Sequence, residues 1–257
     1  MIEDIVGSKN NLLISLKNRL RWWFMPGLDL FTRRRIRLSR HWLRGERKVL
    51  DAGSGNGWFS YLAYRSGAQV IAVNIEKNQV KKAVYFYNLW RGIPLERLKF
   101  LARDLRNLEF FEPEFDEVIC YEVLEHIMDD VGVCKKFWGI LKPGGCLYIS
   151  SPNASHPYWK KKALSPDFSG FHVRAGYTLE SLRSLLEPIG FRIEVFEGMG
   201  GTVLANFSIF LETLRKHFGD FCCLPFLVLA IPIIWLDPIK IKVPFDLYVK
   251  AVKPLDQ

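Results

Sequence analysis

One cluster of residue types in this sequence has the chemistry of a catalytic or metal site. Glu122, Glu125 and His126 follow a run of apolar residues that has the character of a buried strand. If a helical turn begins there, spacings of three and four residues place these side chains close together. Two carboxylates beside an imidazole could serve a general base or hold a divalent cation. His172, on a later loop, is a candidate fourth member of this cluster.

A second feature is a glycine-rich turn with Gly53, Gly55 and Gly57, which Asp51 precedes. Because glycine accepts a positive φ and has no Cβ, such a turn brings backbone amides close to a ligand. A turn of this kind could also be only a tight connection between a strand and a helix, or a dinucleotide site with the fuller spacing Gly-x-Gly-x-x-Gly. The turn therefore predicts a small-ligand site without naming the ligand.

The elements that would position both clusters are alternating strands and helices. We expect strands at residues 49–50, 69–73, 98–102, 115–121, 146–150, 191–196 and 245–252. We expect helices at residues 58–66, 78–90, 132–141 and 178–188. This alternation predicts an α/β fold with a mainly parallel sheet and helices on both faces. In such a sheet the ligand site lies at the carboxyl ends of the strands, where both clusters fall.

Four motifs in order resemble those of the class I S-adenosylmethionine (SAM)-dependent methyltransferases. They are residues 51–57, with the spacing Gly-x-Gly-x-Gly, and residues 101–105, 118–126 and 141–145. The resemblance covers roughly residues 46–197, is strongest to the ubiquinone-pathway O-methyltransferases, and implies a Rossmann-like seven-stranded sheet.

The resemblance also implies roles for the residues of the turn and its neighbours. Gly53, Ser54, Gly55 and Gly57 would pack against the methionine part of SAM, and Asp51 would meet its amino group. Asp104 would meet the adenine amino group, with Leu105 beside the ring.

Asn74 departs from the family's pattern, which has an acidic residue there for the two ribose hydroxyls. Its amide oxygen could accept from the hydroxyls, or Glu76 could reach back to them. Alternatively, Asn74 only caps the strand in a protein without turnover.

The Glu-x-x-Glu-His set has three alternative roles under the resemblance. In the ubiquinone-pathway enzymes and in small-RNA 2′-O-methyltransferases, a similar set is thought to bind magnesium near the accepting hydroxyl. The same string also occurs in relatives without a metal, where the histidine could be a base or only hold a loop. Because an alcohol or phenol needs a base more than an amine does, we expect an oxygen acceptor. SAM would be the cofactor, and a divalent cation such as Mg²⁺ is a further candidate.

Charge and cysteine content bear on partners and compartment. The formal net charge of +9 suggests an anionic partner, either a membrane surface, a nucleic acid or a charged substrate. Five cysteines lack the spacing of a zinc site, and the first residues lack the pattern of a secretory signal. These features predict a cytoplasmic protein.

Residues 46–257 would form the methyltransferase domain, with an apolar insertion at about 201–243. Within it, residues 221–236 carry no charge, but Pro225 and Pro232 interrupt a run that is too short to span a bilayer. We expect an apolar hairpin before the last strand. It could dip into a membrane, pack on its own domain or form a homodimer interface.

Residues 1–45 would form a separate basic and aromatic helical segment. Its arginines, which include Arg33, Arg34 and Arg35, alternate with tryptophan and phenylalanine. This mixture is typical of an interfacial membrane anchor, although RNA-binding segments share it. RNA gives no reason for the apolar hairpin. The sequence thus favours a peripheral, cytosol-facing O-methyltransferase with a lipophilic or lipid-linked acceptor, and the rivals are an RNA methyltransferase and a SAM-binding protein without turnover.

Overall fold

A computed structural model describes residues 30–39, 45–108, 114–161, 164, 172–223, 225–226 and 242–255. The chain divides into two compact units. Met1–Ser39 and Met199–Pro244 form the smaller unit, and Arg40–Gly198 with Phe245–Gln257 form the larger one.

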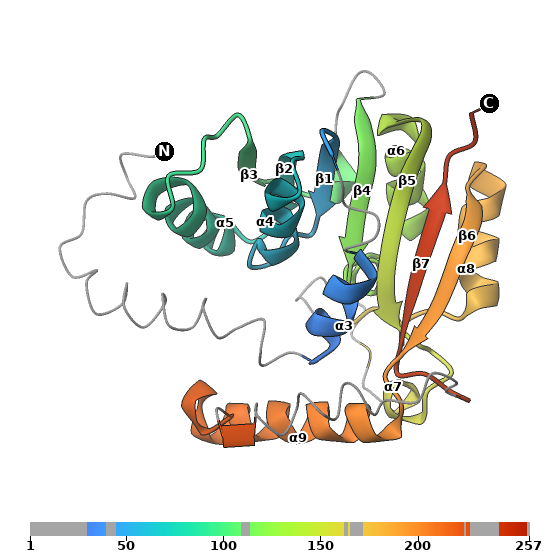
Figure 1. Ribbon diagram of the computed structural model, residues 1–257. Coiled ribbons are helices and arrows are strands. Elements are labelled where there is room, and N and C mark those ends of the chain that lie inside the picture. The colour runs from blue at the N-terminus through green and yellow to red at the C-terminus, as the bar shows by residue number, and fades with distance from the viewer. Residues whose placement is uncertain are drawn as a thin grey trace. The chain divides into compact units, whose positions relative to one another are not determined.

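The larger unit contains a seven-stranded sheet in the order β3-β2-β1-β4-β5-β7-β6 (Figure 1). The strands are β1 (Lys48–Ala52), β2 (Gln69–Asn74), β3 (Leu98–Ala102), β4 (Phe115–Tyr121), β5 (Leu141–Pro152), β6 (Arg192–Met199) and β7 (Asp246–Val252). From β3 to β5 the neighbouring strands pair in parallel, whereas β7 pairs antiparallel with β5. The predicted seven-stranded Rossmann-like sheet is therefore confirmed.

Helices cover both faces of this sheet because alternate strand residues point in opposite directions. Leu50 and Ala52 of β1 join a buried apolar cluster with α6 (Asp130–Ile140) and α8 (Leu179–Leu186). Asp51, which lies between them, points to the other face and meets Ser60 of α4 (Trp58–Arg65). The same alternation that buries the core thus aims the Asp51 carboxylate at the helix that follows the glycine turn.

The predicted boundaries of α6 and β5 were wrong. The helix expected at 132–141 begins at Asp130, because the Asp129 side chain accepts from the Gly132 amide at 2.9 Å as an N-cap. Leu141 belongs to β5, which begins five residues before the expected strand and includes a shift of register opposite Phe115 and Glu117.

The helix expected at 78–90 changes its winding along its length. It begins as α5 (Lys77–Ala83) and continues as the π-helix η1 (Val84–Trp90). Tyr87 of η1 stacks between Tyr61 and Phe100, with ring centroids 5.3 and 5.5 Å away. π-Helical turns often occur at functional sites, and here the turn places an aromatic ring behind the glycine turn.

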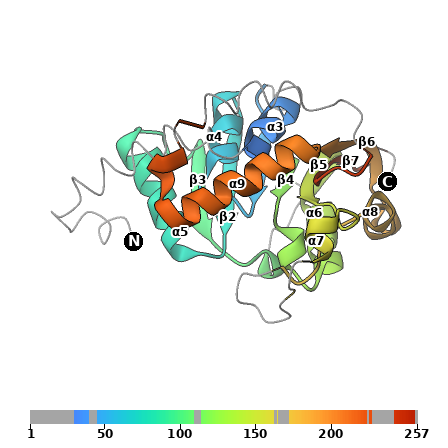
Figure 2. The same ribbon diagram turned by 90° about the horizontal axis from the view of Figure 1, so that it is seen from below.

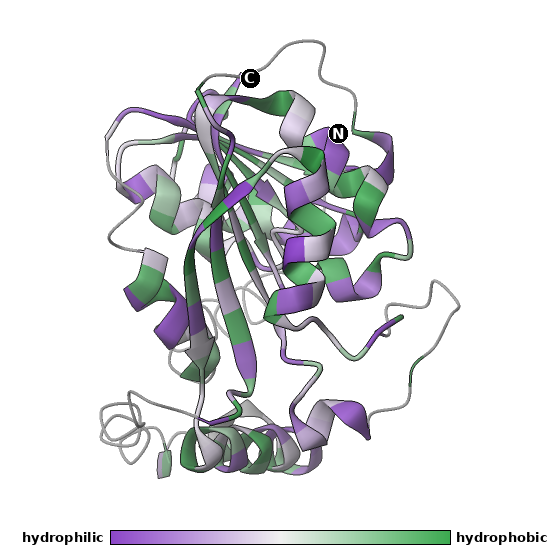
Figure 3. Cartoon of the chain, turned by 90° about the vertical axis from the view of Figure 1, so that its right-hand side faces the viewer, coloured by the Kyte–Doolittle hydropathy of each residue, from purple (hydrophilic) through white to green (hydrophobic). Residues whose placement is uncertain are grey.

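The smaller unit contains α3 (Leu30–Ser39), α9 (Thr202–Phe218) and η5 (Asp220–Cys223). Figure 2 shows α9 along its full length, and Figure 3 shows that hydrophobic and hydrophilic residues alternate along it. The apolar insertion therefore opens with a long helix, which the expected hairpin did not include. Most of the apolar run, residues 227–236, lies outside the described residues, as does the N-terminal segment up to residue 29.

None of the helices described in the structure is long and apolar enough to cross a membrane.

Candidate active site

The glycine turn follows β1 and is packed tightly against Val123, which follows β4, and Phe100 of β3. Its three glycines have positive φ values of 83° at Gly53, 51° at Gly55 and 77° at Gly57. A Cβ on Gly53 would lie 2.2 Å from Val123 Cγ2, and one on Gly57 would lie 2.7 Å from the Phe100 ring. Only glycine satisfies both the backbone conformation and these approaches.

Gly55 differs from the other two glycines because its Cβ position faces open space. The nearest atom is the Gly53 carbonyl oxygen, 4.0 Å away. Ser54 beside it is buried, and its Oγ has no hydrogen-bond partner among the described residues. The turn thus offers an open position for a close-lying ligand, with a polar side chain next to it.

Asp51 is a buried carboxylate at the entrance to this turn. It is 3% exposed and accepts a hydrogen bond from Ser60 Oγ. Burial raises the pKa of Asp51 to about 6, and the bond from Ser60 offsets only part of this shift. A cation next to Asp51 would stabilise its ionised form, so the site suits a positively charged ligand group.

Asn74 ties the end of β2 to the glycine turn. Its Nδ2 lies 3.4 Å from the Gly55 carbonyl oxygen and donates to Gln79 Oε1 at 3.2 Å. Its Oδ1 accepts from the Glu76 amide at 2.8 Å. A carboxylate at this position could not donate to the Gly55 carbonyl oxygen. The side-chain amide of Asn74 therefore holds the end of β2 to the glycine turn.

Asp104 and Leu105 lie at the end of β3, as the motif predicts. Asp104 caps η2 (Leu105–Asn107) by accepting from the Arg106 amide at 2.9 Å. Arg106 also pairs with the carboxylate and holds the pKa of Asp104 below its usual range. Leu105 is buried.

Glu122 stands apart from the cluster that the sequence predicted for it. Its φ of 55° is the only positive value at a residue other than glycine in the described part of the chain. Its side chain accepts from Ser150 Oγ at 2.9 Å, and its amide donates to the Ser150 carbonyl oxygen at 2.8 Å. The left-handed residue interrupts the expected helical turn, which begins only at η3 (Leu124–His126). Strained backbone of this kind is often found at functional sites.

The other three predicted residues do come together. Ligand atoms of Glu125, His126 and His172 all lie within 4.8 Å of one another. His126 Nε2 is 3.9 Å from Glu125 Oε1, and the two imidazole rings meet edge to face with centroids 4.6 Å apart. Glu125 is fully buried, whereas the His126 side chain is 33% exposed. The arrangement gives an accessible imidazole supported by a buried carboxylate.

This cluster lies next to the glycine turn. Val123, whose side chain occupies the space that a Cβ on Gly53 would need, immediately precedes η3. The strands β1 and β4, which lead into the turn and into η3, are parallel neighbours with Asp51 opposite Ile119. Both clusters therefore lie at the same carboxyl edge of the sheet, as predicted.

Comparison with known proteins agrees with this geometry. The family model described as "Methyltransferase domain" matches residues 50–149. A ubiquinone biosynthesis O-methyltransferase of Chromobacterium violaceum is 27% identical over 70% of this chain and 82% of its own length. One from Xanthomonas euvesicatoria is 34% identical, over 52% of this chain and 56% of its own length.

Among solved structures, a phosphoethanolamine N-methyltransferase from Haemonchus contortus, in complex with SAM, shares the fold. Its TM-score is 0.59 at 22% identity, over 84% of this chain and 51% of that one. These findings support a class I SAM-dependent methyltransferase.

SAM, the cofactor of this class, fits the residues of the turn. The open position at Gly55 would admit the close approach of the cofactor's methionine part, and Ser54 Oγ, which has no partner among the described residues, would be available to hydrogen-bond to it. The buried Asp51 carboxylate suits its cationic amino group.

Four residues of the methyltransferase's site carry no sequence signal that would have revealed them. Ser60 holds Asp51, and Ser150 holds Glu122. Trp159 stacks on His172 with ring centroids 5.4 Å apart and donates from Nε1 to the Phe245 carbonyl oxygen at 2.9 Å. Arg174 reaches the backbone on both sides of the Glu125–His126 pair. Each acts through a tertiary contact, which no local pattern in the sequence predicts.

Proposed function

We propose that this methyltransferase transfers the methyl group of SAM to a hydroxyl oxygen of a lipophilic or lipid-linked small molecule at the cytoplasmic face of a membrane. The observation that carries the proposal is the convergence of Glu125, His126 and His172 within 4.8 Å beside the glycine turn.

An oxygen acceptor is the one that most needs these groups. SAM supplies an activated methyl group, so the protein has only to align the acceptor and take up its proton. A hydroxyl loses its proton less readily than an amine loses one on attack, which makes a base more valuable. We infer that His126, whose side chain is 33% exposed, accepts that proton, and that the buried Glu125 carboxylate near it stabilises the charge that the imidazole gains.

The names of the curated relatives favour the same acceptor class. Both are ubiquinone biosynthesis O-methyltransferases, so a phenolic hydroxyl on a quinone precursor is the first acceptor to test. This chain spans 82% of the first relative's length but only 56% of the second's. The proposed acceptor therefore rests on the residues of the site and not on similarity over the full length.

The same three residues could hold a divalent cation near the acceptor. Their donor set would be two imidazole nitrogens and one carboxylate oxygen. Mg²⁺ prefers oxygen ligands, whereas imidazole suits zinc and other transition metals. A cation here would therefore be Zn²⁺ sooner than the Mg²⁺ that the family resemblance suggested.

The membrane part of the proposal is supported by α9. Its exposed residues include Val203, Phe210 and Phe218, which are 60%, 44% and 69% exposed. Arg215 and Lys216 are exposed in its last turn. Exposed apolar side chains next to cations suit the interface of an anionic membrane. In α3, Arg37 is exposed, whereas Arg35 is buried and is not available to such a surface.

A transfer experiment tests the proposal. Purified protein and radiolabelled SAM are incubated with the organic extract, the aqueous extract and the RNA of cells that lack the protein. We expect label in a molecule of the organic extract. Label confined to RNA would support the rival RNA methyltransferase, and no transfer to any fraction would favour a SAM-binding protein without turnover.

A further inference from the structure

We propose that Arg174 is a positioning residue, which clamps the loop bearing His172 onto the turn bearing Glu125 and His126. The inference rests on the proposed function, because it concerns the same cluster.

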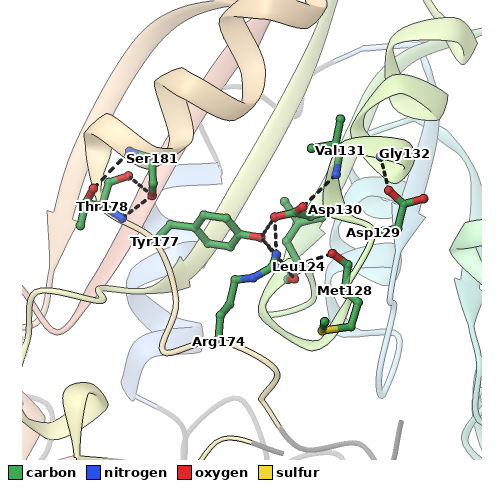
Figure 4. Close-up of polar contacts among 10 residues, drawn as sticks. All are labelled: Leu124, Met128, Asp129, Asp130, Val131, Gly132, Arg174, Tyr177, Thr178 and Ser181. Carbon is green, nitrogen blue, oxygen red and sulfur yellow. Dashed lines mark hydrogen bonds and ion pairs between the residues drawn. The ribbon is translucent and has the colours of Figure 1, made fainter. Parts of the chain in front are cut away.

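The contacts of Arg174 converge from one guanidinium on the backbone around η3 (Figure 4). Nη1 lies 3.3 Å from the Leu124 carbonyl oxygen, and Nη2 donates to the Met128 carbonyl oxygen at 3.1 Å. These two carbonyls lie on either side of Glu125 and His126. The guanidinium therefore fixes both ends of the turn that carries the cluster.

A carboxylate and a hydroxyl hold the guanidinium in place. Arg174 Nη1 pairs with Asp130 Oδ2 and contacts the Tyr177 hydroxyl. The Tyr177 hydroxyl lies 2.7 Å from the same Asp130 oxygen and 3.3 Å from the Leu124 carbonyl oxygen. The Arg174 and Asp130 side chains are only 24% and 16% exposed, so solvent screens this pair weakly.

The clamp fixes His172 because that residue is two positions before Arg174. Between them, the Val173 amide donates to the Glu125 carbonyl oxygen at 2.9 Å. The loop is thus joined to η3 by one backbone bond and by the guanidinium. Together they hold the His172 ring at its 4.6 Å centroid distance from His126.

The chemistry of the contact requires arginine rather than any cation. Two carbonyls, a carboxylate and a hydroxyl are reached at once because the guanidinium spreads its donors over a rigid plane. A lysine ammonium is a compact charge that could satisfy the carboxylate but not the carbonyls on both sides of the pair.

The test compares Arg174→Gln, Arg174→Lys and a control, Arg183→Gln, which removes only an exposed pair with Glu187. In Arg174→Gln we expect Val173 amide exchange to accelerate at least tenfold, because the loss of even one hydrogen bond to a charged group has about that effect and Arg174 makes several. The cross-relaxation between the two imidazole rings should weaken, and kcat should fall by about the same factor with the Kd for SAM unchanged. Arg174→Lys should recover less than half of the loss in kcat, and the control should match the wild type.

Unchanged Val173 exchange and ring contact in Arg174→Gln, or full rescue by lysine, would overturn the clamp. Failure of the proposed function gives a different pattern: the wild type transfers no methyl group, while Val173 exchange still responds to the substitution. If Arg174→Gln does not fold, Tyr177→Phe removes the hydroxyl that contacts Asp130, Arg174 and the Leu124 carbonyl oxygen. It should accelerate Val173 exchange about tenfold, as expected for loss of a hydrogen bond to a charged group, and no acceleration would again overturn the proposal.

Discussion

Burial at the start of the glycine turn raises the pKa of the Asp51 carboxyl into the range of a histidine side chain. Its pKa of about 6 exceeds the ordinary value of 3.8, so at pH 5 the free protein holds a proton there. If the cationic amino group of SAM binds the ionised carboxylate, that proton must leave before SAM binds. Affinity for SAM should therefore fall as the pH drops through 6.

The expected change is about tenfold in Kd for each pH unit below 6, since one proton is linked to binding. Calorimetric titration of SAM between pH 5 and 8 measures it. Asp51→Asn should bind more weakly at pH 8 and show a flat profile over this range. A wild-type Kd that is independent of pH would show that Asp51 does not contact the amino group.

A substitution of His126, combined with a chelator, distinguishes a general base from a metal ligand. His126→Ala should reduce kcat by about 10²-fold to 10⁴-fold, the usual contribution of general-base catalysis, with the Kd for SAM nearly unchanged. EDTA should lower wild-type activity only if Glu125, His126 and His172 hold a cation. His217→Ala, on the exposed surface of α9, is the matched control. Full activity of the His126 variant would exclude both roles.

At the residue scale, the sequence predicted positions better than contacts. Glu125, His126 and His172 meet as expected, but Glu122 turns to Ser150 because its backbone is left-handed. Residue spacing does not predict a left-handed backbone at a glutamate such as Glu122. Likewise, the sequence placed Asn74 at the end of β2 but could not show that its amide is engaged by Gly55 and Glu76.

At the scale of an element, two glycines of the turn, Gly53 and Gly55, have different roles. Gly53 is needed for packing, because its missing Cβ would overlap Val123. Gly55 faces open space, so its missing Cβ matters only to what binds there. Stability and cofactor binding should therefore respond differently to the same substitution at these two positions.

Gly53→Ala should lower the free energy of unfolding well beyond the roughly 1–2 kcal/mol of a left-handed alanine, because the clash adds to that cost. Gly55→Ala should have only the smaller cost while weakening SAM binding by about tenfold or more, as expected where a backbone must lie against its ligand. Thermal unfolding and calorimetry of both variants provide the comparison. Equal losses of stability at the two positions would contradict the division of roles.

Elements were predicted well where hydrophobic pattern alone sets them. The strands β3 and β4 have the expected bounds, because their runs of apolar residues mark them in the sequence. Errors appear where a side chain fixes the end, as Asp129 does for α6, or where winding changes within a helix, as at η1. Such effects depend on tertiary contacts, which a periodic pattern does not contain.

At the scale of the whole molecule, the sequence predicted an apolar insertion but not its form. The uncharged run that begins at Phe221 predicted a hairpin. Residues 202–218 instead form α9, with apolar residues at helical spacing. This helix supports the proposed membrane contact with an apolar face and a basic last turn. The two kinds of side chain should contribute separately to membrane binding.

Phe210→Glu with Phe218→Glu should weaken binding to neutral and anionic vesicles alike, because burial of one such side chain contributes roughly 1.5–3 kcal/mol. Arg215→Gln with Lys216→Gln should weaken binding to anionic vesicles only and reduce its salt dependence. Vesicle flotation measures both, with Thr213→Ser as the control. A wild-type protein that floats with no vesicle of any composition would remove the membrane from the proposal.

The central claim is that a hydroxyl oxygen of a lipophilic molecule receives the methyl group. Its most direct test supplies SAM with a ¹³C-labelled methyl group to the protein and the organic extract of cells that lack it, and records the carbon chemical shift of the product. We predict a methoxy signal in the organic phase that disappears with His126→Ala. A labelled methyl group on nitrogen or carbon, or no labelled product in the organic phase, would contradict the account.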